Sequence, residues 1–247
     1  MPRANRHFLP GHVWHITHRC HKREFLLRFA QDRRRWRHWL YVARRRYGLC
    51  VLNYIVTSNH VHALVYDRGR QEIEKSMQLV SARTAQEYNQ RKNRRGAFWE
   101  DRYHATAVQT GEHLIRCLTY IDLNMVRAAA VCHPRVWRFS GYHELCIPPR
   151  RKLAIDIGQL CQLVGASTID EHRTSRHEAI DSDLDVSQRN PVWTSATAVG
   201  DPQYLAQVQA SLGAAGRYKQ ITSWQHGDCL KDEVPPYSSK KDPKRPD

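Results

Sequence analysis

The sequence predicts an α+β fold in which an antiparallel sheet carries helices on one face. Segments that alternate apolar and polar residues, as strands do, are interrupted by segments whose apolar residues recur every three or four positions, as in amphipathic helices. In the first 127 residues these segments follow the order β-α-β-β-α-β, and a last helix comes after them. This order is the split-βαβ, ferredoxin-like arrangement, and it leaves the second face of the sheet available for a ligand.

The first strand and the first helix are expected within residues 11–47. Residues 11–19 alternate and contain several β-favouring side chains, among them Trp14. From Phe29 to Tyr47 the larger apolar residues fall on one helical face, and arginines supply much of the other. Gly48 directly follows, as a glycine past the last helical turn often does.

A hairpin and a second helix come next. Residues 49–56 and 60–66 are rich in β-formers and flank a short polar break, which predicts two paired strands. From Ile73 to Tyr88 apolar residues recur at steps of four and three, which predicts an amphipathic helix. We expect a fourth strand region within residues 98–108 and a third helix from Glu112 to Arg127.

The composition changes beyond residue 148. Residues 155–164 and 202–212 are expected to be helical, with an acidic, polar stretch between them at 170–185. The tail 235–247, rich in Pro, Ser and Lys, is expected to be disordered. The predicted organisation is therefore a domain at 1–147, a small helical C-terminal extension at 148–234 and a tail at 235–247.

Charge is distributed unevenly along the chain, whose formal net charge is +15. Residues 1–152 contain 29 Lys and Arg against 11 Asp and Glu, a net charge of +18, whereas residues 153–247 contain 10 against 13, a net charge of −3. A basic first part of this kind indicates a polyanionic partner, and nucleic acid before a membrane.

Several classes of protein are disfavoured by the composition. The seven cysteines are scattered and form no CxxC pair, which argues against a zinc ribbon or a disulfide framework. We find no run of apolar residues of transmembrane length, no signal-peptide pattern, no Walker loop for a nucleotide cofactor and no GxSxG elbow. A cytoplasmic protein without a membrane partner, monomeric or dimeric, is the expectation.

The pattern His60-Val61-His62 is a candidate metal site. Side chains alternate across a strand, so His60 and His62 point to the same face and can bind one divalent ion through neutral ring nitrogens. With 15 histidines in the chain the pattern is weakly specific, and two surface histidines on a half-buried strand remain an alternative.

A second candidate is Tyr120 with Asn124. Four residues apart on a predicted helix, they lie side by side at the flank of its apolar stripe. A phenol and a carboxamide can supply a nucleophile and a third metal ligand. Taken alone, the pair favours the simpler alternative, a rim tyrosine with a satisfied hydroxyl and a polar neighbour.

Five blocks in order resemble the REP-associated tyrosine transposases, a branch of the single-tyrosine HUH transposases. The blocks cover residues 1–145. They are Pro2-Arg3 with residues 11–19, residues 59–64, residues 98–103, residues 120–128 and residues 137–142. The family also carries variable helical C-terminal extensions.

The resemblance implies roles for individual residues. His60 and His62 match the histidine pair that binds the metal, and Tyr120 matches the nucleophile. Asn124 matches the polar residue that completes the metal site. The family usually has proline after that asparagine, whereas this chain has Met125, so we expect a straighter helix here.

The implied activity is a metal-dependent single-stranded DNA endonuclease and strand transferase. It would use Mg²⁺ or Mn²⁺ and cut beside a DNA hairpin through a 5′-phosphotyrosine link. The residues expected to contact DNA are arginines for the phosphates and aromatic side chains for stacking on unpaired bases. They are Arg33, Arg34, Arg44, Arg45, Arg94, Arg95, Arg102, Tyr103 and Trp14.

Two other functions remain open. The chain could be a non-catalytic module, derived from a transposase, that binds DNA hairpins or structured RNA. It could also be a metal hydrolase of another class that binds zinc through His60 and His62, although no HExxH pattern accompanies them. For each predicted DNA-contacting aromatic residue, a place in the core is the simpler alternative.

Overall fold

A computed structural model describes residues 8–149, 153–183, 190–224 and 227–232. The tail predicted at 235–247 lies outside these residues. The strands are β1 Val13–Arg19, β2 Cys50–Val56, β3 His60–Tyr66, β4 His104–Val108, β5 Ala198–Gly200, β6 Lys219–Trp224 and β7 Gly227–Asp232. The α-helices are α1 Ala30–Tyr47, α2 Glu72–Arg91, α3 Glu112–Asp122, α4 Asn124–Arg127, α5 Gly141–Cys146, α6 Ile157–Val164, α7 Ile169–Asp183, α8 Val192–Ser195 and α9 Pro202–Ser211.

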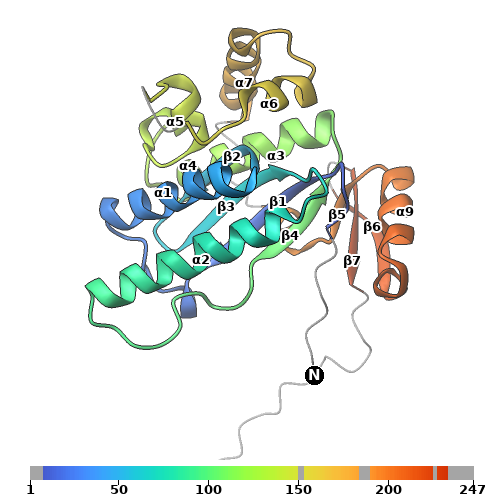
Figure 1. Cartoon of the computed structure of the whole chain (residues 1–247). Coiled ribbons are helices and arrows are strands. Elements are labelled where there is room, and N and C mark those ends of the chain that lie inside the picture. Colours follow the sequence, from blue (N-terminus) through green and yellow to red (C-terminus); the bar gives the residue numbers. More distant parts are fainter. Residues whose placement is uncertain (1–7, 150–152, 184–189, 225–226, 233–247) are drawn as a thin grey trace, which may run out of the picture.

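One sheet runs through the described part of the molecule in the order β2-β3-β1-β4-β5-β7-β6 (Figure 1). The first four strands pair antiparallel, with β1 at the centre between β3 and β4. This is the predicted ferredoxin-like arrangement, so the α+β fold class is confirmed. The predicted hairpin is β2 with β3, and Gly48 ends α1 in a left-handed conformation, with φ of 74°.

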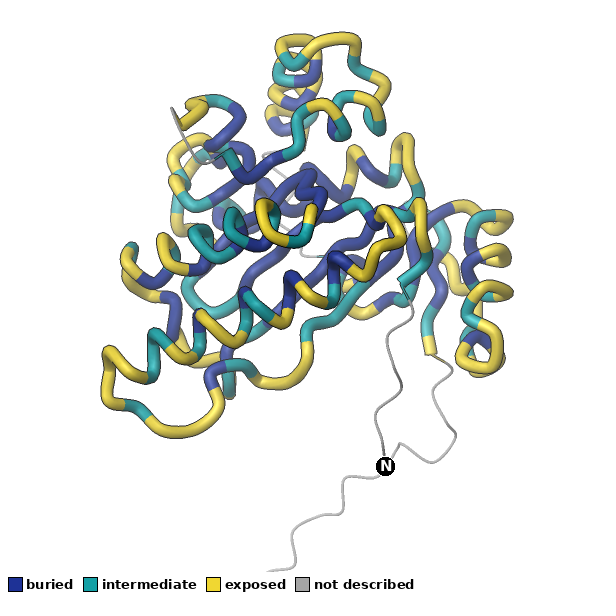
Figure 2. Tube along the Cα trace, in the orientation of Figure 1, coloured by how far each residue is buried: buried dark blue, intermediate teal, exposed yellow. Residues whose placement is uncertain are grey.

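Helices α1 and α2 lie side by side on one face of the sheet (Figure 1). Trp36 is buried under α1, and Arg35 holds Glu87 of α2 through a hydrogen bond of 2.6 Å from Nε. Both helices bury an inner face and keep an exposed outer face, so buried and exposed residues alternate along each of them (Figure 2). The amphipathic patterns therefore predicted which face each helix buries.

The opposite face of the sheet is not open, contrary to the sequence prediction. Helices α3 and α8 pack against it, and the first six residues of β1 are buried on both faces of the strand. The prediction was wrong because a helix after the sheet and a segment of the extension both return to this face. Any site on it therefore lies between the sheet and α3 or α8.

Two predicted elements differ from the structure. The strand expected within residues 98–108 is shorter, because regular pairing with β1 begins only at His104. The helix expected from Glu112 to Arg127 is divided at Leu123 into α3 and α4. Arg127 hydrogen-bonds the carbonyl of Tyr120, the acceptor that a continuous helix would offer to the backbone N–H of Asn124. The helix is thus interrupted where a straighter helix was expected, and the Arg127 side chain contacts a carbonyl at the interruption.

The part of the chain after residue 148 contains strands as well as helices. The expected helices are present as α6 and α9, but β5 joins β4 in a parallel pair and continues the sheet through β7 to β6. The acidic stretch is itself helix α7, whose buried face consists of His172, Arg176 and Ile180 at four-residue spacing. Across the residues described, we find no helix with the length and hydropathy needed to cross a membrane.

Candidate active site

The candidate site lies on the face of the sheet covered by α3 and α8, where β1 and β3 are paired. Thr17 is opposite His62 and Arg19 is opposite His60, so these four side chains share one face. His15 lies two positions before Thr17 on the same face. The strand register thus brings a third histidine to the predicted pair.

His62 is fully buried and is held at both ring nitrogens. Its Nδ1 lies 2.9 Å from Nε2 of His15 and 3.1 Å from the hydroxyl of Thr17, and its Nε2 lies 3.1 Å from the amide nitrogen of Asn124. His15 is 0% exposed, and its Nδ1 lies 2.8 Å from the carbonyl oxygen of Trp193 in α8. Burial lowers the pKa of His15 to about 4, so this ring is neutral at pH 7.

His60 is held by the turn that precedes it. Its Nδ1 lies 2.7 Å from the side-chain oxygen of Asn59 and 3.0 Å from the hydroxyl of Thr57. The rings of His60 and His62 are 4.9 Å apart and nearly perpendicular, at 87°. The two imidazoles therefore lie next to each other, as their positions on one face of β3 require.

Tyr120 and Asn124 reach the same region from the α3–α4 junction. The Tyr120 ring lies 5.9 Å from that of His62 and 6.0 Å from that of His15. Arg127 lies over the ring at 4.7 Å, and Trp193 is 6.1 Å away. The phenol is only 4% exposed, and its hydroxyl has no hydrogen-bond partner among the described residues. The expectation of a rim tyrosine was therefore wrong.

The donor atoms present fit a divalent cation. Nδ1 of His60 lies beside the side-chain oxygen of Asn59, an acceptor, which favours a lone pair on Nε2 of His60, and the Asn124 amide lies beside Nε2 of His62. Two imidazoles and one amide can hold a transition metal or Mg²⁺ and leave positions for substrate oxygens. A separate group, His133, His177 and Asp181, also brings possible ligand atoms within 4.8 Å of one another, and it includes none of the predicted site residues.

Two hollows adjoin the site and share Arg19. One, of about 180 Å³, is lined by Arg19, Arg23, Asn59 and His60. The other, of about 150 Å³, is lined by Thr17, Arg19, Glu100, Asp101, Arg102, His104 and Thr194. Because a guanidinium forks well onto phosphate oxygens, Arg19 is a candidate phosphate contact between the two hollows.

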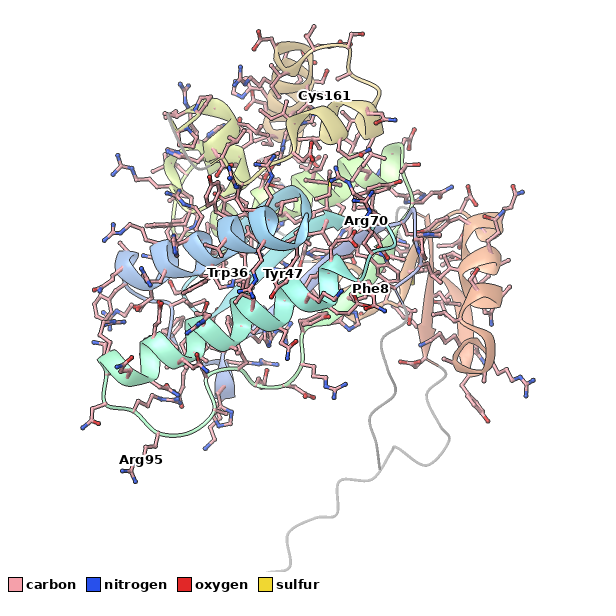
Figure 3. All side chains as sticks on the ribbon, in the orientation of Figure 1. Phe8, Trp36, Tyr47, Arg70, Arg95 and Cys161 are labelled. Carbon is pink, nitrogen blue, oxygen red and sulfur yellow. The ribbon has the colours of Figure 1, made fainter. Side chains whose placement is uncertain are left out.

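The predicted DNA-contacting residues do not form one group. Arg34, Arg45, Arg95 and Arg102 are exposed, and Arg95 projects away from the loop after α2 (Figure 3). Arg33 lies over Trp137 at 4.7 Å, Arg44 donates to the carbonyl of Leu153, and Arg94 donates to the carbonyl of Ala97.

The two predicted stacking residues lie against neighbouring rings. Trp14 is 3% exposed and packs edge-on against Phe8 in the core, which corrects its prediction as a surface for base stacking. Tyr103 is half-buried, with its ring stacked 6.4 Å from Phe8.

Comparison with known proteins places the first part of the chain. Residues 10–124 match the family model described as "Transposase IS200 like". Over these residues the chain is similar to the IS200-like transposases. The matched region, the IS200-like domain, runs from before β1 to Asn124 and so includes His15, His60, His62 and Tyr120.

A solved structure shares the fold. It is described as "Structure of the REP associates tyrosine transposase bound to a REP hairpin", with a TM-score of 0.50 and 18% sequence identity. The likeness covers 60% of this chain and 87% of that chain. No curated protein matches the chain in sequence. The resemblance to the single-tyrosine transposases is confirmed by the family model and by the fold of the IS200-like domain.

Four residues beside this site were not identified from the sequence. They are His15, Thr17, Arg19 and Trp193. The first three lie in the 11–19 block that carried the resemblance, and their alternation with a period of two was the available signal. Trp193 contributes a backbone carbonyl from beyond the IS200-like domain, for which no sequence pattern exists.

Proposed function

We propose that the protein is a metal-dependent single-stranded DNA endonuclease and strand transferase that cuts beside a DNA hairpin. The observation that carries the proposal is the convergence of Tyr120, His60, His62 and Asn124 between β3 and the α3–α4 junction. A buried phenol hydroxyl without a hydrogen-bond partner among the described residues is costly unless a ligand completes it, and a nucleophile that meets its substrate here would be completed.

His60, His62 and Asn124 would hold a divalent cation, Mg²⁺ or Mn²⁺. A cation bound there would neutralise charge on the scissile phosphate. Tyr120 would form the new bond from its oxygen to phosphorus as the phenol loses its proton, the bond from phosphorus to the 3′ oxygen would break, and the leaving 3′ oxygen would take up a proton to become a hydroxyl. The reverse attack by a 3′-hydroxyl rejoins strands, since the phosphotyrosine link keeps the energy of the broken bond.

Access to Tyr120 requires motion. The phenol is covered by Arg127 and lies beside Trp193, so a DNA strand reaches its oxygen only after surrounding side chains move. The two hollows that share Arg19 lead to His60 and Thr17 from the surface. The hollow at His60, lined by Arg19 and Arg23, offers a phosphodiester a basic approach to the site, whereas the hollow at Thr17 also contains Glu100 and Asp101. The protein with the similar fold is described as bound to a REP hairpin, which supports a hairpin as the partner here.

The test is recovery of a covalent protein–DNA adduct. The protein is incubated with Mg²⁺ or Mn²⁺ and a labelled single strand flanked by a hairpin, and adducts are resolved on a denaturing gel. We expect an adduct with the wild-type chain and none with Tyr120→Phe. Tyr66→Phe is the matched control. It removes another tyrosine hydroxyl, from the face of β3 that carries His60 and His62, and it should retain the adduct. An adduct formed by Tyr120→Phe would show that Tyr120 is not the nucleophile.

The metal role is tested separately. His60→Ala combined with His62→Ala should abolish the adduct, and a chelator should abolish it with the wild-type chain. Added Mg²⁺ or Mn²⁺ should restore the adduct with the chelated wild-type chain and not with the double variant. Full cleavage by the double variant would remove the metal role assigned to these histidines.

A second candidate is a non-catalytic module that binds hairpins, and the 4% exposure of Tyr120 favours it. Such a module would bind the hairpin-flanked strand and form no adduct under any metal condition. The adduct experiment therefore separates the two functions. A fully paired duplex of the same sequence is added to that experiment as a further substrate, and its cleavage as fast as that of the single strand would contradict the single-strand mechanism.

A further inference from the structure

Within the proposed active site, a chain of hydrogen bonds links α8 to the predicted metal ligand His62. We propose that His15 is a positioning residue that keeps the proton of His62 on Nδ1, so that Nε2 of His62 faces the cation. This inference rests on the proposed function. It adds a residue of the IS200-like domain and a backbone carbonyl of the C-terminal extension to the machinery of the site.

The first link fixes the proton of His15. The carbonyl oxygen of Trp193 can only accept a hydrogen bond, and it lies 2.8 Å from Nδ1 of His15. Nδ1 of His15 therefore carries the proton. A neutral imidazole has one proton, so Nε2 of His15 is left as an acceptor.

The second link fixes the proton of His62. Nε2 of His15 lies 2.9 Å from Nδ1 of His62, so Nδ1 of His62 is the donor, with the Thr17 hydroxyl as a second neighbour at 3.1 Å. Nε2 of His62 then carries a lone pair. The Asn124 amide gives independent support, because its nitrogen lies 3.1 Å from Nε2 of His62, where an N–H donates to a lone pair.

The two predicted metal ligands are hydrogen-bonded by residues of different structural elements. Asn59, next to His60 in the chain, orients His60 within the β2–β3 turn. His62 depends on His15 from the neighbouring strand and, through it, on α8. Thr106 of β4 supports this segment, since its hydroxyl donates to the carbonyl of Ala196, directly after α8, at 2.7 Å and lies 3.3 Å from the carbonyl of Trp193.

The consequence for metal binding depends on the tautomer. An imidazole that carries its proton on Nε2 must lose or move that proton before it can bind a cation there. Removing the partner that orients a ligating histidine lowers metal affinity by about 10–100-fold in known sites. We expect an effect of this size for His15→Phe, which keeps a ring and removes both nitrogens.

The decisive measurement is the tautomer of His62 in the metal-free, full-length protein. Long-range ¹H–¹⁵N correlation spectra of ¹⁵N-histidine-labelled protein distinguish Nδ1–H from Nε2–H rings, and a His62→Asn spectrum assigns the His62 signals. We expect the Nδ1–H form for both His15 and His62 at pH 7.5. A His62 ring with its proton on Nε2 would overturn the proposal, without requiring any variant of His15 to fold.

Variants then test the role of His15. His15→Phe should shift His62 toward the Nε2–H form and weaken Mn²⁺ binding, followed by the electron paramagnetic resonance of free Mn²⁺, by about 10–100-fold. His15→Gln, whose amide oxygen can accept from His62, should restore most of both. Thr17→Val, the matched control at the other neighbour of Nδ1, should keep the Nδ1–H form. An unchanged tautomer in His15→Phe would contradict the proposal.

These results are independent of DNA cleavage. If no adduct forms with the wild-type chain, the proposed function fails, yet the spectra still report whether His15 controls His62. If adducts form but His62 carries its proton on Nε2, the proposed function stands and the role of His15 fails.

Discussion

Tyr120 combines a reactive group with an unfavourable place in the fold. Its ring fills space between His15, His62 and Trp193, while its hydroxyl is buried without a hydrogen-bond partner among the described residues. A buried hydroxyl of this kind costs about 1–3 kcal/mol of folding free energy. The site therefore keeps a destabilising group, which a substrate bound as proposed would complete.

This cost predicts that activity and stability change in opposite directions at residue 120. Tyr120→Phe removes the hydroxyl and keeps the ring, so the free energy of unfolding should stay the same or rise by about 1 kcal/mol while the adduct disappears. Urea unfolding of both proteins measures the difference. Tyr54→Phe is the control, because the hydroxyl of Tyr54 donates to Glu144 at 2.7 Å and its loss should destabilise the chain. Clear destabilisation by Tyr120→Phe would mean that the hydroxyl is satisfied in solution.

Helix α7 is the element that ties the extension to the α3–α4 junction. Arg176 on α7 donates to Asp122, the last residue of α3, at 2.6 Å, and Asn53 of β2 donates to the same carboxylate at 2.9 Å. Both charged groups are buried. Burial raises the pKa of Asp122, and Arg176 and Asn53 oppose that rise. Asp122 is two residues from both Tyr120 and Asn124, so the ion pair holds the backbone segment between these two residues.

Breaking this buried pair should be costly. Arg176→Met leaves an unpaired buried carboxylate and should lower the free energy of unfolding by about 3–5 kcal/mol. Asp122→Asn combined with Arg176→Met removes both charges and should recover part of that loss. Thermal unfolding of the single and double variants provides the comparison. A double variant no more stable than Arg176→Met would show that charge pairing is not the cause.

A buried histidine on the same helix predicts a pH dependence. His172 is 5% exposed, and burial, followed by the charge of Arg176, lowers its pKa from 6.5 to about 4. Between these values the unfolded chain binds a proton that the folded chain does not, so stability falls as the pH drops from 6.5 toward 4 and is constant above that window. The slope reaches about 1.4 kcal/mol per pH unit.

His172→Leu removes the imidazole that binds this proton in the unfolded chain and keeps an apolar side chain at the buried position. Urea unfolding at pH 7.5 and pH 5.0 should show a smaller loss of stability at the lower pH for His172→Leu than for the wild-type chain. An equal loss in both proteins would assign the pH dependence to other groups.

At the scale of elements, the sequence predicted the features that depend on periodicity and missed those that depend on tertiary contact. The apolar patterns of α1 and α2 and the alternation in β1 to β3 were sufficient, since each element buries one regular face. β5 has only three residues, Ala198–Gly200, and no period can be detected over that length. The break at Leu123 accompanies a hydrogen bond from Arg127 to the carbonyl of Tyr120, and no local propensity indicates that contact.

At the site, residue types and spacing indicated candidate metal ligands and a candidate nucleophile, but they did not indicate which residues surround them. His60, His62, Tyr120 and Asn124 could be proposed from spacing and resemblance, and the structure brings them together. Their roles in binding and catalysis remain proposals. The burial of Tyr120 could not be predicted, because the ring is covered in part by Trp193, which is 73 positions away in the chain.

Over the whole molecule, charge is the feature most directly tied to a DNA partner. The net charge of +18 in residues 1–152 and −3 in residues 153–247 places the attraction for phosphates on the first part. The predicted division at residue 147 remains a proposal, although side chains from both parts share one hydrophobic core.

Affinity for a hairpin-flanked strand should therefore fall steeply with salt. Each phosphate contact contributes about 0.7–0.9 to the slope of log affinity against log salt. Arg95→Gln, at the projecting loop after α2, should weaken binding and lower that slope, whereas Arg217→Gln, an exposed arginine of the acidic part, should change neither. Fluorescence anisotropy at several salt concentrations measures both. Equal effects of the two substitutions would show that binding does not favour the basic part.

The bond from His15 to α8 ends on a backbone carbonyl, and this has a consequence for how such a chain can change during evolution. A carbonyl is supplied by every amino acid, so the residue at position 193 is free to vary as far as this hydrogen bond is concerned, provided that the local backbone keeps its path. Two descendants of one ancestor could share this bond while their extensions no longer resemble each other in sequence. The conserved feature would then be the position of a peptide group, and a comparison of side chains alone would not detect it.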